Sequence, residues 1–266
     1  VGEQHRFIVA EQLRIIGLKN PHIILEPEPK NTSAAITVGS LYSQKMNLKE
    51  PLLVLPSDHY IENTKEFIEL MIKSSQFDIK NKLICFGIEP TLPEVKYGYI
   101  IKEVTGNDQS TLSKINKFVE KPSTIKAKSL IKDKALWNSG MFLFNADSLL
   151  NEVKLQCLSI YKNSKLSLDK AKPDMDFIRL DSRSFKKITP ISIDHSVFEK
   201  SNNIYVVPTN LNWNDLGTYN ALWDIGKKDN NNNVINGDVI IDNVKNSYIY
   251  SDKNLVAVSN IENVNI

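Results

Sequence analysis

The stretch at residues 52–59, which reads LLVLPSDH, constrains the fold of this chain most strongly. Its four consecutive apolar residues predict a strand buried on both faces, as in a parallel sheet flanked by helices. Pro56 has no N–H group to donate, so the strand is expected to end there. In open α/β sheets, ligands bind beyond the carboxyl ends of the strands, where Ser57, Asp58 and His59 would lie. Asp58 is therefore a candidate metal ligand, and capping of the next helix or turn is the alternative role.

The composition is that of an ordinary globular protein. The 266 residues suffice for one large α/β domain or two small ones, with 41% hydrophobic and 24% charged residues. The basic residues form no dense block, so the net charge of +2 gives no support to nucleic-acid binding. Cys85 and Cys157 show no zinc or disulfide spacing, and no apolar run reaches the length of a membrane span. We expect a cytoplasmic protein without a membrane segment, and a homo-oligomer is compatible with the sequence.

Hydrophobic periodicity predicts alternating strands and helices. Strands are expected at residues 22–25, 83–88, 93–101, 115–120, 141–144 and 204–208, and helices at 5–16, 31–46, 63–75 and 123–131. Residues 146–200 read as largely helical with a break at 172–174. From residue 230 onward, short β runs between Asn-Gly, Asp-Asn and Ser-Asp turns suggest a β-helix or a small β-domain. The expected domains are therefore 1–229 and 230–266.

Polar residues beside these elements are further candidates for a binding site. Asn31 and Thr32 open a helix, whose free N–H groups suit a phosphate or the edge of a base, but plain capping is the commoner role of such residues. Glu120 and Lys121 follow a strand, where a carboxylate can accept from sugar hydroxyls and an ammonium can neutralise a phosphate. A solvated surface pair is the alternative for these two residues.

Three more residues complete the set of candidates. Gly98 interrupts a predicted strand, which indicates a bulge or the close approach of another group, such as a sugar ring. Asn138 could bind sugar hydroxyls or simply form a turn. Asp215 stands at a strand-to-helix turn, where it could cap the helix. Two converging carboxylates, Asp58 and Asp215, would also provide the protein ligands that Mg²⁺ usually has, with phosphates and water completing its shell.

Taken in order, several motifs resemble those of the bacterial mannose-1-phosphate guanylyltransferases. The motifs are LEPEPKNTSAAI, LVLPSDHYI, FGIEPTLPEVKYGYI, FVEKP, LWNSGMFLF, SIDHSVFEKS, WNDLGTYNALWDI and NGDVIIDNVKNSYIY. The chain is most similar to the long form, in which a guanylyltransferase domain and a β-helical segment precede a mannose-6-phosphate isomerase domain. The resemblance implies a Rossmann-like nucleotidyltransferase domain with a mixed, mostly parallel sheet, followed by the start of a β-helix-like segment.

The resemblance also implies a reaction. GTP and mannose 1-phosphate would give GDP-mannose and pyrophosphate by in-line attack of the sugar phosphate on the α-phosphorus. Asp58 and Asp215 match the family's metal-binding acids, which hold Mg²⁺ against the phosphates. Lys121 matches the lysine that binds the sugar phosphate. Catalysis would then consist of positioning and charge neutralisation.

The same resemblance assigns the substrate pockets. The residues expected around mannose are Gly98, Glu120, Lys121 and Asn138. Those expected to face the nucleotide are Asn31, Thr32, Ser57 and Asp58. Another hexose-1-phosphate nucleotidyltransferase and a non-catalytic sugar-nucleotide-binding subunit are the alternatives. A P-loop protein is disfavoured, because no GxxxxGK[ST] motif occurs.

The chain departs from the family pattern in several places. It lacks the glycine-rich GGxGxRLWP loop and the isomerase domain, so we expect a fragment that is poorly soluble and inactive as written. His195 stands where a tyrosine is more usual. Residues 30–35 lack the arginine and proline that are frequent there, which bears on base selectivity rather than on the class of reaction.

Overall fold

The computed structural model describes residues 1–103 and 111–266. The chain divides into two compact units: unit 1 comprises residues 1–55 and 65–210, and unit 2 comprises residues 56–64 and 211–266. The second unit therefore begins before residue 230 and includes the segment after the LLVL run. Within the described ranges, no helix has both the length and the apolar character needed to cross a membrane.

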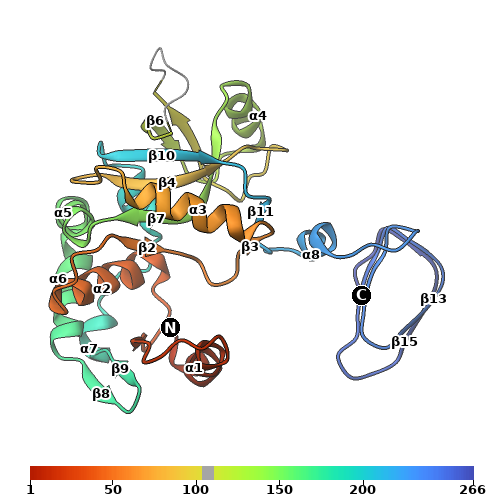
Figure 1. Cartoon of the computed structure of the whole chain (residues 1–266), viewed down its shortest axis with the longest axis horizontal. Helices are drawn as coiled ribbons and strands as arrows, with labels where there is room; N and C mark the ends of the chain where they lie inside the picture. Colours follow the sequence, from red (N-terminus) through yellow and green to blue (C-terminus); the bar gives the residue numbers. More distant parts are fainter. Residues whose placement is uncertain (104–110) are drawn as a thin grey trace. The chain divides into compact units, whose positions relative to one another are not determined.

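A mixed six-stranded sheet forms the centre of unit 1, with the order β2-β7-β4-β10-β6-β5 (Figure 1). Its strands are β2 (Leu52–Val54), β4 (Leu83–Ile88), β5 (Tyr99–Lys102), β6 (Ser113–Val119), β7 (Leu136–Phe144) and β10 (Ile204–Thr209). Among the described residues, β4 and β10 are the only parallel pair of this sheet. The mixed sheet is confirmed, but the expectation that it is mostly parallel is wrong, because β7 pairs antiparallel with β2, β4 and β5.

The LLVL strand lies at the edge of this sheet. In the described part of the chain β2 pairs with β7 alone, and the side chains of Leu53 and Leu55 are 38% and 46% exposed. The prediction of a parallel strand buried on both faces is therefore wrong for this segment. That description fits β4, which is buried throughout and lies between β7 and β10. A short apolar run indicates a strand, but it does not fix the position of that strand in the sheet.

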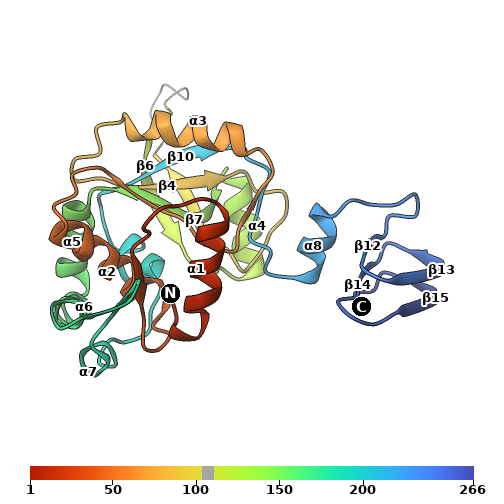
Figure 2. The same ribbon diagram turned by 60° about the horizontal axis from the view of Figure 1, so that its bottom comes forward.

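Helices pack on the sheet of unit 1. The helices α2 (Asn31–Lys45), α5 (Ala146–Gln156) and α6 (Leu158–Asp169) pack together and enclose the main core with alternate side chains of the sheet, such as Cys85 and Phe142. The helix α3 (Thr64–Ser75) runs across the sheet in both views (Figures 1 and 2). The helix α4 (Thr124–Lys132) begins after Ser123, whose Oγ accepts from the Lys126 amide.

The face of α3 is less buried than its periodicity predicts. Phe67, Ile68, Met71 and Ile72 recur along α3 at helical spacing, which predicts that all four face the sheet. Met71 is buried, whereas Ile68 and Ile72 are 55% and 57% exposed. The helix covers the sheet through a narrower stripe than the sequence pattern indicates.

A second, three-stranded sheet completes unit 1. Its order is β1-β9-β8, with β1 (Ile23–Leu25), β8 (Lys172–Asp174) and β9 (Phe177–Arg179). The expected helix break at residues 172–174 is thus the first strand of a hairpin. Short helices η1 (Glu3–His5), α1 (Arg6–Ile15) and α7 (Ser182–Phe185) flank it, and Leu13 of α1 packs against Ile23 and Leu25.

Unit 2 consists of a short ladder, one helix and a set of parallel strand pairs. The strands β3 (Tyr60–Ile61) and β11 (Trp213–Asn214) pair antiparallel, and the helix α8 (Tyr219–Ile225) follows. The remaining strands are β12 (Val234–Asn236), β13 (Val239–Lys245), β14 (Tyr248–Tyr250) and β15 (Val256–Glu262). β12 pairs with β14 and β13 with β15, both in parallel.

Asparagine occupies most of the left-handed turn positions. Among the described residues, fourteen non-glycine residues have positive φ, and ten of these are asparagine. The amide side chain of asparagine can bond to its own backbone, so asparagine adopts this conformation more readily than other L-residues.

Candidate functional site

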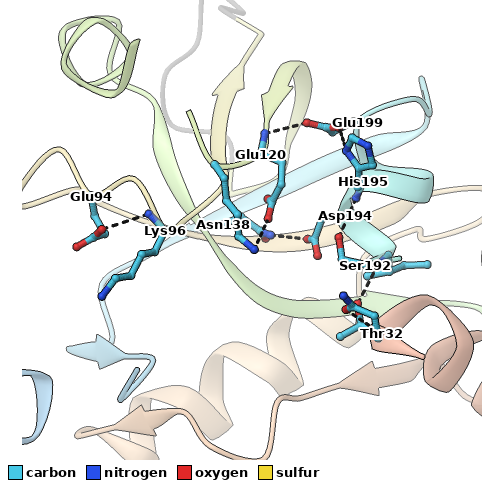
Figure 3. Close-up of polar contacts among 12 residues, drawn as sticks. Thr32, Glu94, Lys96, Glu120, Asn138, Ser192, Asp194, His195 and Glu199 are labelled. Carbon is cyan, nitrogen blue, oxygen red and sulfur yellow. Dashed lines mark hydrogen bonds and ion pairs between the residues drawn. The ribbon is translucent and has the colours of Figure 1, made fainter. Parts of the chain in front are cut away.

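A group of interacting polar side chains lies at one end of the central sheet of unit 1 (Figure 3). We call it the polar cluster, and it consists of Glu120, Asn138, Asp194, His195 and Glu199. Glu120 follows β6, Asn138 lies in β7, and the other three belong to or follow the helix η2 (Asp194–Phe198). Glu120 and Asn138, both substrate-binding candidates on sequence grounds, lie in this one network.

Asn138 is placed by an irregularity in β7. Phe142 pairs with Cys85 and Asn138 with Gly87, so residues 139–141 bulge opposite a single residue of β4. The alternative that Asn138 forms a turn is therefore wrong, because the strand runs through it. The Asn138 side chain is buried, and its Nδ2 donates to Asp194 Oδ1 at 2.6 Å.

Asp194 and Glu199 lie on one face because η2 is a π-helix. The Glu199 amide donates to the Asp194 carbonyl at 2.8 Å, which is the i→i+5 bond of a π turn. In an α-helix of 3.6 residues per turn, residues five apart point in different directions. Glu199 Oε1 accepts from the Glu120 amide at 2.9 Å, and Glu199 Oε2 lies 2.6 Å from His195 Nδ1.

Two carboxyl groups of the polar cluster, those of Glu120 and Asp194, have raised pKa values. Burial, and next to it the charge of Asp194, raise the pKa of Glu120 to about 7, against an opposing effect of Lys121. Burial likewise raises the pKa of Asp194, against the hydrogen bond from Asn138. A protonated carboxyl can donate as well as accept, so the cluster offers both kinds of partner to hydroxyl groups.

Lys121 lies beside the cluster in a left-handed turn, with φ of +46°. Its Nζ is 3.8 Å from Glu120 Oε1, and its side chain is 67% exposed, whereas that of Glu120 is 16% exposed. The alternative of a solvated surface pair therefore holds for Lys121 but not for Glu120, whose side chain is shielded. Its ammonium group is accessible to an anionic ligand.

Gly98 provides the space that Glu120 occupies. A Cβ atom at this position would lie 2.6 Å from Glu120 Oε2, which is shorter than van der Waals contact. The Gly98 carbonyl also accepts from the Asn138 amide at 2.8 Å. The sequence predicts either a bulge at Gly98 or the close approach of another group. The structure shows close approach, by the Glu120 side chain, and Gly98 lies immediately before β5.

The N-terminus of α2 is tied to the segment that precedes η2. Thr32 Oγ1 accepts from the Ile193 amide at 2.9 Å, and the Ser33 amide donates to the Ile191 carbonyl at 3.2 Å. Asn31 Oδ1 accepts from the Thr32 amide at 2.8 Å. The Thr32 side chain thus binds the segment before η2 rather than capping its own helix. The amides of Thr32 and Ser33, at the helix end expected to face a nucleotide, already have hydrogen-bond partners.

Asp58 and Asp215 come together in unit 2. Tyr60 pairs with Asn214 in the β3–β11 ladder, so Asp58 and Asp215 both lie just beyond the same end of that ladder. Neither caps a helix: α3 begins only at Thr64, and Thr218 Oγ1 caps α8 by accepting from Ala221 at 3.1 Å. The helix-capping alternative is therefore wrong for both acids, and Asp215 Oδ1 instead accepts from the Gly217 amide at 3.1 Å.

His59 lies near these acids. Its Nδ1 accepts from Trp213 Nε1 at 3.0 Å, and the two rings meet edge to face. Burial lowers the pKa of His59, while the charges of Asp58 and Asp215 oppose that shift. Both carboxylates are therefore close enough to act on one ring.

The groups of unit 2 that could bind a metal ion are the carboxylates of Asp58 and Asp215. In the described ranges no three or more His, Cys, Asp or Glu side chains converge in a way that could hold a metal ion by themselves. Mg²⁺ commonly uses one or two carboxylates together with substrate phosphates and water, so this set fits Mg²⁺. Ser57 and Asp58 are exposed in the turn before β3.

Asp194 and Glu199 are not predicted as site residues from the sequence, and His195 stands out there only as a departure from the family. All three occur in the motif SIDHSVFEKS, which was recognised without assigned roles. Asp194 and Glu199 are five residues apart, and side chains at this spacing share a face in a π turn but not in an α-helix. Ordinary helical periodicity therefore does not predict that they converge.

The nucleotidyl transferase family model matches residues 1–232 of this chain. Mannose-1-phosphate guanylyltransferase of Escherichia coli is 40% identical over 271 residues, which cover 99% of this chain and 58% of that protein. This chain thus spans little more than half the length of that relative.

Two solved structures are also similar. A structure described as mannose-1-phosphate geranyltransferase from Thermus thermophilus has a TM-score of 0.80 and 25% identity, and the match covers 96% of this chain and 74% of that one. Mannose-6-phosphate isomerase from Helicobacter pylori gives a TM-score of 0.71 at 29% identity, covering 80% and 83%. With the match over residues 1–232, the chain belongs to the nucleotidyl transferase family.

Proposed function

We propose that this protein is a mannose-1-phosphate guanylyltransferase, which forms GDP-mannose and pyrophosphate from GTP and mannose 1-phosphate. The observation that carries the reaction class is the β3–β11 pairing, which sets Asp58 and Asp215 at one end of a ladder. The choice of substrates rests on the E. coli relative, which is similar along nearly the whole chain.

The carboxylate pair of unit 2 would hold the metal ion. Nucleotidyl transferases generally use a divalent metal, and the two-carboxylate donor set supports Mg²⁺. When bound, Mg²⁺ neutralises phosphate charge and orients the reacting groups. Asp58 and Asp215 would place it, and Trp213 would hold the His59 ring beside them through the indole N–H.

The polar cluster of unit 1 would bind the hexose. Glu120 and Asn138 offer acceptors and donors to hydroxyl groups, and Gly98 leaves the space that Glu120 needs. Lys121 would neutralise the sugar phosphate as a point charge. These residues would orient a phosphate oxygen for in-line attack on the α-phosphorus of GTP, with no covalent enzyme intermediate.

The proposal extends to the nucleotide site and to the two domains. Asn31, Thr32, Ser57 and Asp58 would face the nucleotide. Residues 1–229 would form the transferase domain and 230–266 a β-helix-like segment. The parallel pairings β12–β14 and β13–β15 support the β-helix, because a coil that returns to the same side stacks its strands in parallel.

A calorimetric titration of GDP-mannose with Mg²⁺ tests the proposal, with UDP-glucose as the control ligand and circular dichroism to confirm folding. We expect binding of GDP-mannose in preference to UDP-glucose. A folded sample that prefers UDP-glucose or dTDP-glucose would assign the protein to another hexose and nucleotide. A folded sample that binds none of them would refute the proposed substrates.

A further inference from the structure

We propose that Glu199 is a positioning residue that holds the turn between β6 and α4, and with it Glu120 and Lys121, in the geometry that binds a hexose phosphate. This inference rests on the proposed function, because it concerns the same substrate. Glu199 itself is not expected to touch the ligand. It acts through the backbone of Glu120.

The first support is that both carboxylate oxygens of Glu199 are engaged. Oε1 accepts from the Glu120 amide at 2.9 Å, and Oε2 lies 2.6 Å from His195 Nδ1. The Glu199 side chain is only 23% exposed, so water competes weakly for these contacts. One carboxylate therefore connects η2 to the residue that follows β6 (Figure 3).

The second support is the conformation of the turn. Lys121 has φ of +46°, a region that lysine rarely adopts, so neighbouring contacts must hold it there. The Glu120 amide, which donates to Glu199, is one residue before this position. Loss of that acceptor would let the turn relax and would move both the Glu120 carboxyl and the Lys121 ammonium.

The third support is the π turn. The bond from the Glu199 amide to the Asp194 carbonyl puts both side chains on the face that meets the cluster. Asp194 holds Asn138, and Glu199 holds Glu120. One helical turn thus fixes both residues that are proposed to bind the sugar hydroxyls.

Charge must be separated from positioning in any test. Glu199 also raises the pKa of Glu120, as Asp194 does, while Lys121 and His195 lower it. Glu199→Ala and Glu199→Gln remove the same charge. The Gln side chain, however, keeps a carbonyl oxygen that can accept from the Glu120 amide. A difference between the two variants therefore reports the hydrogen bond.

The experiment titrates mannose 1-phosphate and, separately, GDP into wild type, Glu199→Ala and Glu199→Gln, each with Mg²⁺. Glu199→Ala is expected to weaken mannose 1-phosphate binding about tenfold or more, since a hydrogen bond to a charged group is lost, with GDP binding changed less than about twofold. Glu199→Gln should stay within about threefold of wild type for both ligands. Asp169→Ala is the matched control, because it breaks the exposed i,i+4 pair with Lys165 on α6. It should change neither affinity.

Hydrogen exchange of the Glu120 and Lys121 amides gives a second readout that needs no ligand. Exchange should be faster in Glu199→Ala than in wild type and close to wild type in Glu199→Gln. Unchanged sugar-phosphate binding in Glu199→Ala, with wild type binding normally, would overturn the inference. A wild type that fails to bind mannose 1-phosphate would instead refute the proposed function, and unchanged amide exchange in Glu199→Ala would then overturn the positioning role as well.

Discussion

The polar cluster of unit 1 and the carboxylate pair of unit 2 use acidic side chains in opposite ways. In the polar cluster, Glu120 and Asp194 are mostly shielded, and burial raises the pKa of both. In unit 2, Asp58 is exposed beside a turn, and its charge and that of Asp215 act on His59. A shielded carboxyl suits uncharged hydroxyl groups, whereas carboxylates open to solvent, such as the exposed Asp58 and the half-buried Asp215, suit a cation. In the proposed function, the polar cluster would bind the sugar and the carboxylate pair would place the metal ion.

The largest effect is expected from Asp215→Asn, introduced into the chain with the glycine-rich loop restored so that turnover can be measured. The asparagine side chain has nearly the same size as aspartate but lacks its negative charge, so the metal ion would be held less well. A bound metal contributes several kcal/mol to such a step, so kcat/KM should fall at least about a hundredfold. Steady-state pyrophosphate release at several Mg²⁺ concentrations measures this. Asp224→Asn, on the exposed side of α8 in the same unit, is the control. Near-normal turnover of Asp215→Asn would remove Asp215 from the metal site.

The second prediction concerns pH and Glu120. Its pKa is raised from the ordinary 4.5 to about 7, so between these values the native state keeps a proton that the unfolded chain has lost. The contribution of Glu120 to stability is therefore full below about pH 4.5 and is lost as the pH rises to about 7. Glu120→Gln should be more stable than wild type at pH 8 by up to about 3 kcal/mol, with a smaller difference at pH 5. Urea unfolding at both values tests this, and an equal difference at both would contradict the shifted pKa.

The third prediction compares two glycines. Gly98→Ala would push against the end of the Glu120 side chain and against the Phe118 ring, so hexose phosphate affinity should fall about tenfold with some loss of stability. Gly39→Ala, in α2, meets nothing within 4 Å and should stabilise the protein by about 0.5–1 kcal/mol without affecting binding. Calorimetry and thermal unfolding of both variants measure these effects. Unaltered sugar binding in Gly98→Ala would show that Glu120 does not need its present position.

The smallest effect is expected at Thr218, the cap of α8. Thr218→Ala removes the acceptor for the Ala221 amide and should lower stability by about 1 kcal/mol, whereas Thr218→Ser should keep most of it. Denaturant titration of the two variants gives the difference. If Asp215→Asn lowered the free energy of unfolding as much as Thr218→Ala, this would show that Asp215 also contributes to capping α8.

Local signals in the sequence predicted much of the secondary structure. The strand at residues 83–88 and the helix predicted at 123–131 follow from hydrophobic periodicity, and both are confirmed. The edge position of β2 was not predictable, because a run of apolar residues carries no information on which strands will be its neighbours. The place of each strand in the sheet depends on pairings between distant segments.

The candidate site was predictable to a similar extent. Glu120 and Asn138 follow from their motifs, and the structure places both in one network. The partners that hold them, Asp194 and Glu199, were not found, because a π turn leaves no periodic mark in a sequence. The bulge that carries Asn138 could equally be a turn on sequence grounds, because both features use the same small polar residues.

The asparagine-rich turns have a consequence for the unfolded chain. Only ten of the 266 residues are glycine, although many turns need a left-handed residue, and asparagine supplies most of those positions. A residue with a side chain samples fewer backbone states than glycine when the chain is unfolded, so less disorder must be given up on folding. The turns of this protein are therefore set partly by limiting the freedom of the chain before it folds.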